Sequence, residues 1–67
     1  MEIQLYRGYK IVPNDRPHFR EADILSNSHL VGYVWQGVSG NRTDDDLLAE
    51  CCAVIDDYIL WKEAHVR

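Results

Sequence analysis

The segment from Thr43 to His65 has the pattern of one long amphipathic helix, and this helix limits the folds open to a chain of 67 residues. Thr43 is a suitable N-cap, and the three aspartates that follow it would meet the positive end of the helix dipole. Thr43 and Asp46 have the spacing of a shortened capping box. At 100° per residue, one face gathers the side chains expected to pack on a sheet: Leu47, Leu48, Cys51, Val54, Ile55, Tyr58 and Ile59.

The residues before this helix carry strand patterns. Residues 2–12 alternate between apolar and polar side chains, which predicts a half-buried strand. Arg7 interrupts the apolar face, so the strand either has a bulge near Arg7 and Gly8 or begins nearer Leu5. The two prolines in residues 13–17 predict a loop, and residues 18–26 are interpreted as a second strand. After a turn at residues 27 and 28, residues 30–38 form a third strand that is apolar on both faces. Such a strand is either covered on both faces or carries an exposed aromatic patch.

This order of elements predicts an α+β fold. Three antiparallel strands (β-β-β-α) form a sheet, and the C-terminal helix packs on one face of it. A chain of this length makes a single small domain, so we expect one domain over residues 1–67, with the sheet in residues 1–38 and the helix in residues 43–65.

The net charge of −4 is unevenly distributed. Residues 1–42 contain five basic and four acidic residues, a net of +1, whereas residues 43–67 contain two basic and seven acidic residues, a net of −5. Nucleic acid is therefore a possible partner that the charge disfavours. The sequence has no apolar run long enough to span a membrane and does not begin like a secretory signal, so we expect a cytoplasmic protein that does not bind membranes.

The spacing of the reactive residues gives little support for a catalytic or metal-binding site. The histidines and cysteines lack the spacing of a metal site, and we expect neither metal nor cofactor. Cys51 and Cys52 lie in the body of the helix beside carboxylates, where a reactive thiolate is disfavoured. The remaining acidic residues follow a solvated helix face, and a chain this short has little room for a pocket. We therefore expect a protein that is not an enzyme.

The helix is too long for the sheet that precedes it. About 20 helical residues span roughly 30 Å, whereas three strands are only about 10 Å across. The helix end should project, and packing on the sheet explains neither Leu60 nor Trp61. We predict a small non-enzymatic protein–protein interaction module, either a homodimer or a partner of another protein. Its predicted interface consists of Trp35, Tyr58, Leu60 and Trp61.

Two alternatives remain open. In the first, an exposed sheet face with Tyr33 and nearby cations binds nucleic acid by stacking. The possible ligand contacts are then Arg7, Lys10, Arg20 and Tyr33. In the second, the acidic helix imitates nucleic acid and blocks a basic partner protein. This hypothesis predicts that reversing the charges of Asp56 and Asp57 abolishes binding and leaves the fold intact.

Overall fold

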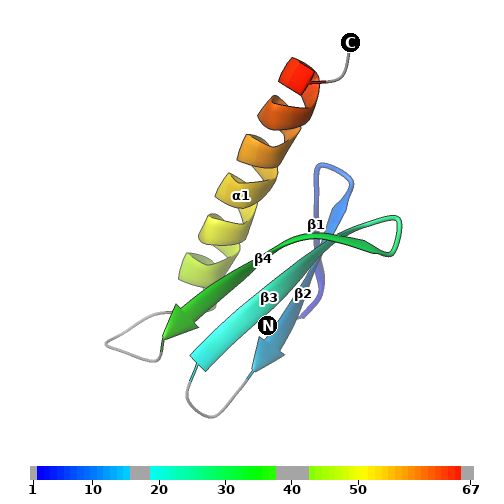
Figure 1. Ribbon diagram of the computed structural model, residues 1–67. Helices are drawn as coiled ribbons and strands as arrows, with labels where there is room; N and C mark the ends of the chain where they lie inside the picture. Colours follow the sequence, from blue (N-terminus) through cyan, green and yellow to red (C-terminus); the bar gives the residue numbers. More distant parts are fainter. Residues whose placement is uncertain (1, 16–18, 38–42, 66–67) are drawn as a thin grey trace.

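The computed structural model describes residues 2–15, 19–37 and 43–65, which form one antiparallel sheet and one C-terminal helix (Figure 1). The elements are β1 (Gln4–Tyr6), β2 (Tyr9–Asp15), β3 (Phe19–Ser26), β4 (His29–Gly37) and α1 (Asp44–His65). The strands follow one another across the sheet in chain order, and each pair is antiparallel. The α+β class is confirmed, but the prediction of three strands is wrong because the sheet has four.

The additional strand results from a tight turn at Arg7 and Gly8. Their φ angles are 52° and 85°, and Tyr6 pairs with Tyr9 on either side of them. Two consecutive positive φ angles define the two-residue turn that suits a β-hairpin, and glycine adopts this conformation without strain. The expected bulge is therefore a turn. As a consequence Tyr9 is buried, whereas Leu5, which alternation placed on the same face, is 74% exposed.

Strand β2 continues through Pro13, where the sequence predicted a loop. Pro13 pairs with Ala22 of β3, whereas the pairing of β1 with β2 ends at Ile11. Among the described residues, β2 is therefore an edge strand at Pro13. A proline lacks the backbone N–H, and it is tolerated where one side of a strand has no partner.

Strands β3 and β4 confirm the other two predicted strands. The turn between them lies at Asn27 and Ser28, as expected, and both residues have positive φ angles, 50° and 69°. His18 and Val38, at the outer ends of the predicted strands, lie outside the described residues. The short antiparallel connections explain why all four strands form a simple meander.

A bulge in the β3–β4 ladder changes which side chains of β4 face the helix. The register shifts between Ile24 and Leu25, so that Leu25 pairs with Leu30 while Ile24 pairs with Gly32. Val31 is the extra residue, and it packs against the core, whereas Leu30 is exposed. Strict alternation along residues 30–38 would place these two side chains the opposite way round, because it does not allow for the extra residue that a bulge adds to one strand.

Helix α1 covers one face of the sheet and closes the core. The capping box is confirmed: the Thr43 hydroxyl accepts a hydrogen bond from the Asp46 N–H at 3.3 Å, and an Asp46 carboxylate oxygen accepts one from the Thr43 N–H at 3.0 Å. The buried apolar residues come from both layers: Tyr9, Ile11, Ala22, Ile24 and Val34 from the sheet, and Leu47, Cys51 and Ile55 from the helix.

The helix extends beyond the sheet, as its length predicted. Its 22 residues correspond to about 33 Å. Its fully buried side chains end at Ile55, and every side chain from Leu60 to His65 is exposed. Figure 1 shows the last turns of α1 passing the two hairpin turns of the sheet. Within the described residues, no helix has both the length and the hydropathy of a membrane span.

Candidate interaction surface

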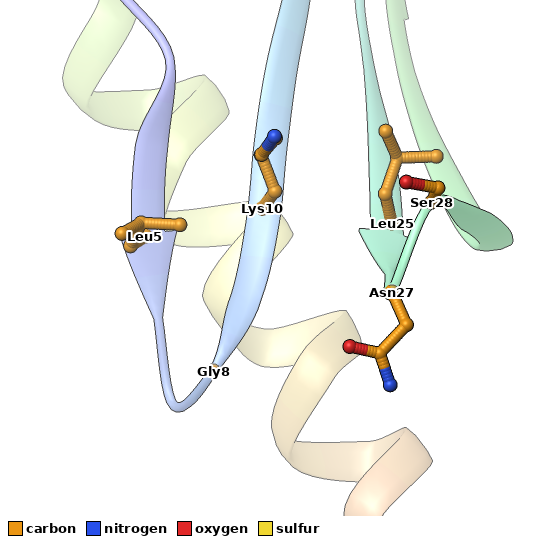
Figure 2. A pocket seen from close by; sticks show the side chains of 6 residues that line it. All are labelled: Leu5, Gly8, Lys10, Leu25, Asn27 and Ser28. Carbon is orange, nitrogen blue, oxygen red and sulfur yellow. The ribbon is translucent and has the colours of Figure 1, made fainter.

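The sheet face turned away from α1 is uncovered in the part of the chain that the structure describes. We call it the open face, and Figure 2 shows three of its side chains in front of the sheet with the helix behind. It carries the side chains that alternate with the core residues in the strand register: Leu5, Lys10, Val12, Asn14, Phe19, Glu21, Asp23, Leu25, Leu30, Tyr33 and Trp35.

Three aromatic side chains gather at one end of the open face, and we call Phe19, Tyr33 and Trp35 the aromatic patch. The ring centroids of Phe19 and Trp35 are 5.9 Å apart at a tilt of 40°. A Cβ added at Gly37 would lie 3.6 Å from the Trp35 ring, so the ring spreads over a bare glycine. Tyr33 is 58% exposed and Trp35 is 55% exposed. Strand β4 is therefore the strand with an exposed aromatic patch, not one covered on both faces.

Carboxylates border the aromatic patch. Asp23 lies directly across the ladder from Tyr33, and Glu21 lies across from Trp35. Asn14 donates a hydrogen bond to the Asp23 carboxylate at 3.3 Å, which holds this carboxylate on the open face. A negatively charged ligand would meet these groups as soon as it stacked on the rings. The patch thus combines apolar contact area with hydrogen-bond acceptors.

The possible ligand contacts do not converge. Lys10 lies on the open face, directly across the β2–β3 ladder from Leu25. Arg20 points to the opposite face, where it forms an ion pair with Asp44 at the start of α1. Arg7 lies in the β1–β2 turn and pairs with Asp56 of the helix. Of the predicted group, only Lys10 and Tyr33 share a face.

A shallow hollow lies at the other end of the open face, beside the two hairpin turns (Figure 2). Its volume is about 240 Å³, below the roughly 300–1,000 Å³ of typical small-molecule sites. The residues that line it are Leu5, Gly8, Lys10, Leu25, Asn27 and Ser28. Lys10 is the charged side chain among these lining residues.

A second group of rings lies towards the C-terminal end of α1, where Tyr58 is half-buried and Trp61 and His65 are exposed. The rings of Tyr58 and Trp61 are stacked 6.1 Å apart, and those of Trp61 and His65 are stacked 4.6 Å apart. The Lys62 ammonium lies 5.7 Å from the centre of the Tyr58 ring. Tyr58 also packs against Tyr9 of the sheet in a T-shaped arrangement, with ring centroids 6.0 Å apart. We call Tyr58, Trp61 and His65 the helix-end stack.

The structure divides the four predicted interface residues between two surfaces. Trp35 belongs to the open face, two residues before the end of β4. Tyr58, Leu60 and Trp61 lie in the C-terminal half of the helix, towards the other end of the sheet, because α1 begins near the end of β4 and runs back past the hairpin turns (Figure 1). Leu60 and Trp61 are 64% and 55% exposed. The alternation of side chains in β4 places Trp35 on the open face, and the direction of α1 places Trp61 towards the other end of the molecule. The two tryptophans therefore belong to different surfaces.

The β1–β2 turn is fastened to the helix through Asp56. The Tyr6 hydroxyl donates to the Asp56 carboxylate at 3.0 Å, and the Arg7 guanidinium donates to it at 2.8 Å. The hydrogen bond from Arg7 holds the pKa of Asp56 below its ordinary 3.8, with Tyr6 adding to the effect. The hydrogen bond to Asp56 also raises the pKa of the Tyr6 hydroxyl. Fifty residues separate Tyr6 from Asp56, so no local pattern could have predicted this contact.

Replacing Asp56 by asparagine is therefore expected to lower the free energy of unfolding near neutral pH. A lowered pKa means that the contact stabilises the folded state above pH 3.8 and is lost as the pH falls through the folded-state value. The difference from wild type should therefore shrink in acid. Urea denaturation followed by circular dichroism, at neutral pH and in acid, measures this difference in the free energy of unfolding. Asp57→Asn, at an exposed neighbour, should match wild type throughout, and a constant Asp56→Asn deficit would contradict the assignment.

The two cysteines are not placed for nucleophilic chemistry. Burial raises the pKa of the Cys51 thiol to about 11, and the neighbouring Cys52 and Glu50 add to the shift. Burial also raises the pKa of Cys52, with a contribution from Asp56. Both thiols are thus protonated at neutral pH, and a protonated thiol is a poor nucleophile and metal ligand. Among the described residues, no three His, Cys, Asp or Glu side chains gather as a metal site would require.

Comparison with protein families, with curated proteins and with solved structures finds no match to this chain. The functional argument therefore depends on the geometry of the surfaces described above.

Proposed function

We propose that the chain is a small non-enzymatic protein–protein interaction module that associates with a second copy of itself. The observation that carries this proposal is the aromatic patch, which stays exposed because the single helix covers only the other face of the sheet. Exposed aromatic rings with a polar border are typical of interface centres. In a chain of 67 residues, association also adds buried apolar area that a small core cannot supply.

The polar border of the patch supports a protein partner over a nucleic acid. Tyr33 and Trp35 have one carboxylate each as their cross-strand neighbour, and Lys10 is the cation of this face among the described residues. Phosphate groups bind where basic residues outnumber acidic ones, whereas backbone N–H groups and hydroxyls of a protein can donate to carboxylates. A second copy of the chain can supply such uncharged donors to the carboxylates of the open face.

Nucleic-acid binding is the second candidate, because exposed rings and Lys10 do share one face. Single-stranded RNA stacks on such rings when cations track its backbone. Titration of tryptophan fluorescence with a short single-stranded RNA tests this candidate. Strong quenching that depends on Trp35 and weakens with salt would favour nucleic acid over the proposed function.

The acidic helix is a third candidate surface, and in the structure some of its carboxylates are already paired with residues of the same chain. Asp44 is paired with Arg20, and Asp56 is held by Tyr6 and Arg7. Reversing the charge of Asp56 would disturb the fold, so it cannot serve as a test of partner binding alone. The exposed carboxylates of the helix outside these contacts include Asp45, Asp57 and Glu63.

Light scattering over a concentration series tests self-association. The wild-type mass should rise from 7.8 kDa towards twice that value. The double variant Tyr33→Ala, Trp35→Ala should remain at the lower mass, since truncation of a central interface aromatic costs at least about 2 kcal/mol, roughly a 30-fold loss of affinity. Circular dichroism should show that its fold is retained.

Two further variants locate the contact. Trp61→Ala and Leu60→Ala report whether the exposed end of the helix takes part. A wild-type protein that stays monomeric at every concentration would refute self-association. A dimer that only these helix variants dissociate would move the contact from the open face to the helix end.

A further inference from the structure

Strand β4 is a long edge of the sheet. It contains nine residues and pairs with β3 alone among the described strands. The opposite edge, β1, contains only three residues. In an antiparallel sheet, every second residue of an edge strand directs its N–H and C=O away from the sheet. A long edge of this kind is a template for pairing with another strand.

The sequence of β4 lacks the features that usually protect such an edge. Natural edge strands are protected by lysine or other charged residues, by proline, by a bulge, or by a helix or loop that covers them. The nine residues of β4, HLVGYVWQG, include neither a Lys, Arg, Asp or Glu nor a proline. The bulge lies close to the hairpin turn, so the register from Gly32 to Gly37 is regular. Six consecutive residues are thus in position to pair.

Charge favours contact between two copies at this edge over contact through their helix faces. The chain carries a net charge of −4, and two copies that met through their acidic helix faces would repel each other. Since β4 itself has no acidic residue, two β4 strands can approach without bringing carboxylates of the same strand together. Strand pairing is also self-complementary, which is what a two-fold axis requires.

A two-fold axis between two β4 strands also brings helix ends of opposite charge together. An axis perpendicular to the sheet pairs β4 with itself in antiparallel orientation and leaves both helices on one face, antiparallel to each other. Helix α1 lies close to β4, since Val54 is placed 3.5 Å from a Cβ built on Gly32. Each helix begins with Asp44, Asp45 and Asp46, and its last turn carries Lys62 and His65 together with Glu63. In this arrangement the acidic start of one helix faces the Lys62 ammonium of its partner.

We propose that two copies pair along β4 to form one continuous antiparallel sheet, with both helices on one face. On the other face the two aromatic patches lie side by side, and Tyr33 and Trp35 of one copy become cross-strand neighbours of the same residues in the other copy. This inference depends on the self-association proposed above and assigns its geometry. A standard interface buries about 800 Å² on each partner, roughly one sixth of the 4863 Å² surface of this chain. The β4 edge, the flanks of Tyr33 and Trp35 and the adjoining helix surface lie together along one side of the molecule.

Nuclear magnetic resonance on a mixture of isotope-labelled and unlabelled protein tests the pairing directly. The expected result is a set of contacts between backbone protons of β4 in one copy and β4 in the other, in antiparallel register. A wild-type monomer at all concentrations would overturn both the self-association and this inference. A dimer whose intermolecular contacts exclude β4 would overturn this inference alone and leave the proposed function standing.

Charge reversal tests the arrangement of the helices. Asp45→Lys and Lys62→Glu should each weaken the dimer roughly two- to five-fold, the range expected for an exposed ion pair. The double variant should recover wild-type affinity, because residue 45 of one copy then meets residue 62 of the other with opposite charges restored. Asp57→Lys is the matched control for a change of net charge. A double variant no tighter than the single ones would overturn the antiparallel placement of the helices.

Discussion

Truncation of Ile55 to alanine is expected to unfold a large part of the protein at room temperature. Ile55 is completely buried between α1 and the sheet. Replacing a buried isoleucine by alanine costs about 2–5 kcal/mol, since it removes apolar burial and leaves a cavity. At roughly 0.05–0.15 kcal/mol per residue, a domain of this size has only about 3–10 kcal/mol of stability. One side chain therefore carries a large share of the total.

The control for this experiment is Leu60→Ala, which removes an apolar side chain of similar volume from the same helix. Leu60 is 64% exposed, so its truncation should change stability by no more than about 0.5 kcal/mol. Urea denaturation followed by circular dichroism measures both variants, at a protein concentration where each has the same association state. Equal stability losses for the two variants would show that α1 does not pack on the sheet through its Leu47, Cys51 and Ile55 face.

The helix could be predicted in detail from the sequence because its signals are local. The capping box needs only Thr43 and Asp46, and the apolar stripe repeats with the helical period. The turn at Arg7 and Gly8 was missed because the alternation of apolar residues continues through it, so a single strand with a bulge fitted equally well. Gly8 was the available signal, since two strand segments flank the Arg-Gly pair as they flank a hairpin turn.

The surfaces were harder to predict because they depend on how many layers cover the sheet. Alternation in β4 placed Tyr33 and Trp35 on one face, but it could not decide whether that face was covered. Four strands and one helix leave it uncovered. The contact of Tyr6 and Arg7 with Asp56 depends on the crossing of α1 over the hairpin, which strand and helix periodicity do not specify.

Gln36 is a further residue that the sequence did not single out, and it gives the second large prediction. It lies on the helix-covered face of β4, opposite Arg20, and is only 3% exposed. Neither Nε2 nor Oε1 of its side chain has a hydrogen-bond partner in the part of the chain that the structure describes. A buried amide without partners has lost its hydrogen bonds to water, which costs about 1–3 kcal/mol in protein mutational data.

Replacing Gln36 by methionine is therefore expected to raise the free energy of unfolding by about 1–3 kcal/mol. Methionine has a similar length, fills irregular space and carries no amide to desolvate. Gln4→Met is the matched control: Gln4 lies on the exposed strand β1, where the same change should stay within about 0.5 kcal/mol of wild type. Urea denaturation of the three proteins decides the question. A Gln36→Met variant less stable than wild type would show that the amide does form hydrogen bonds in the folded protein, and that its polarity contributes to the packing of α1 on β4.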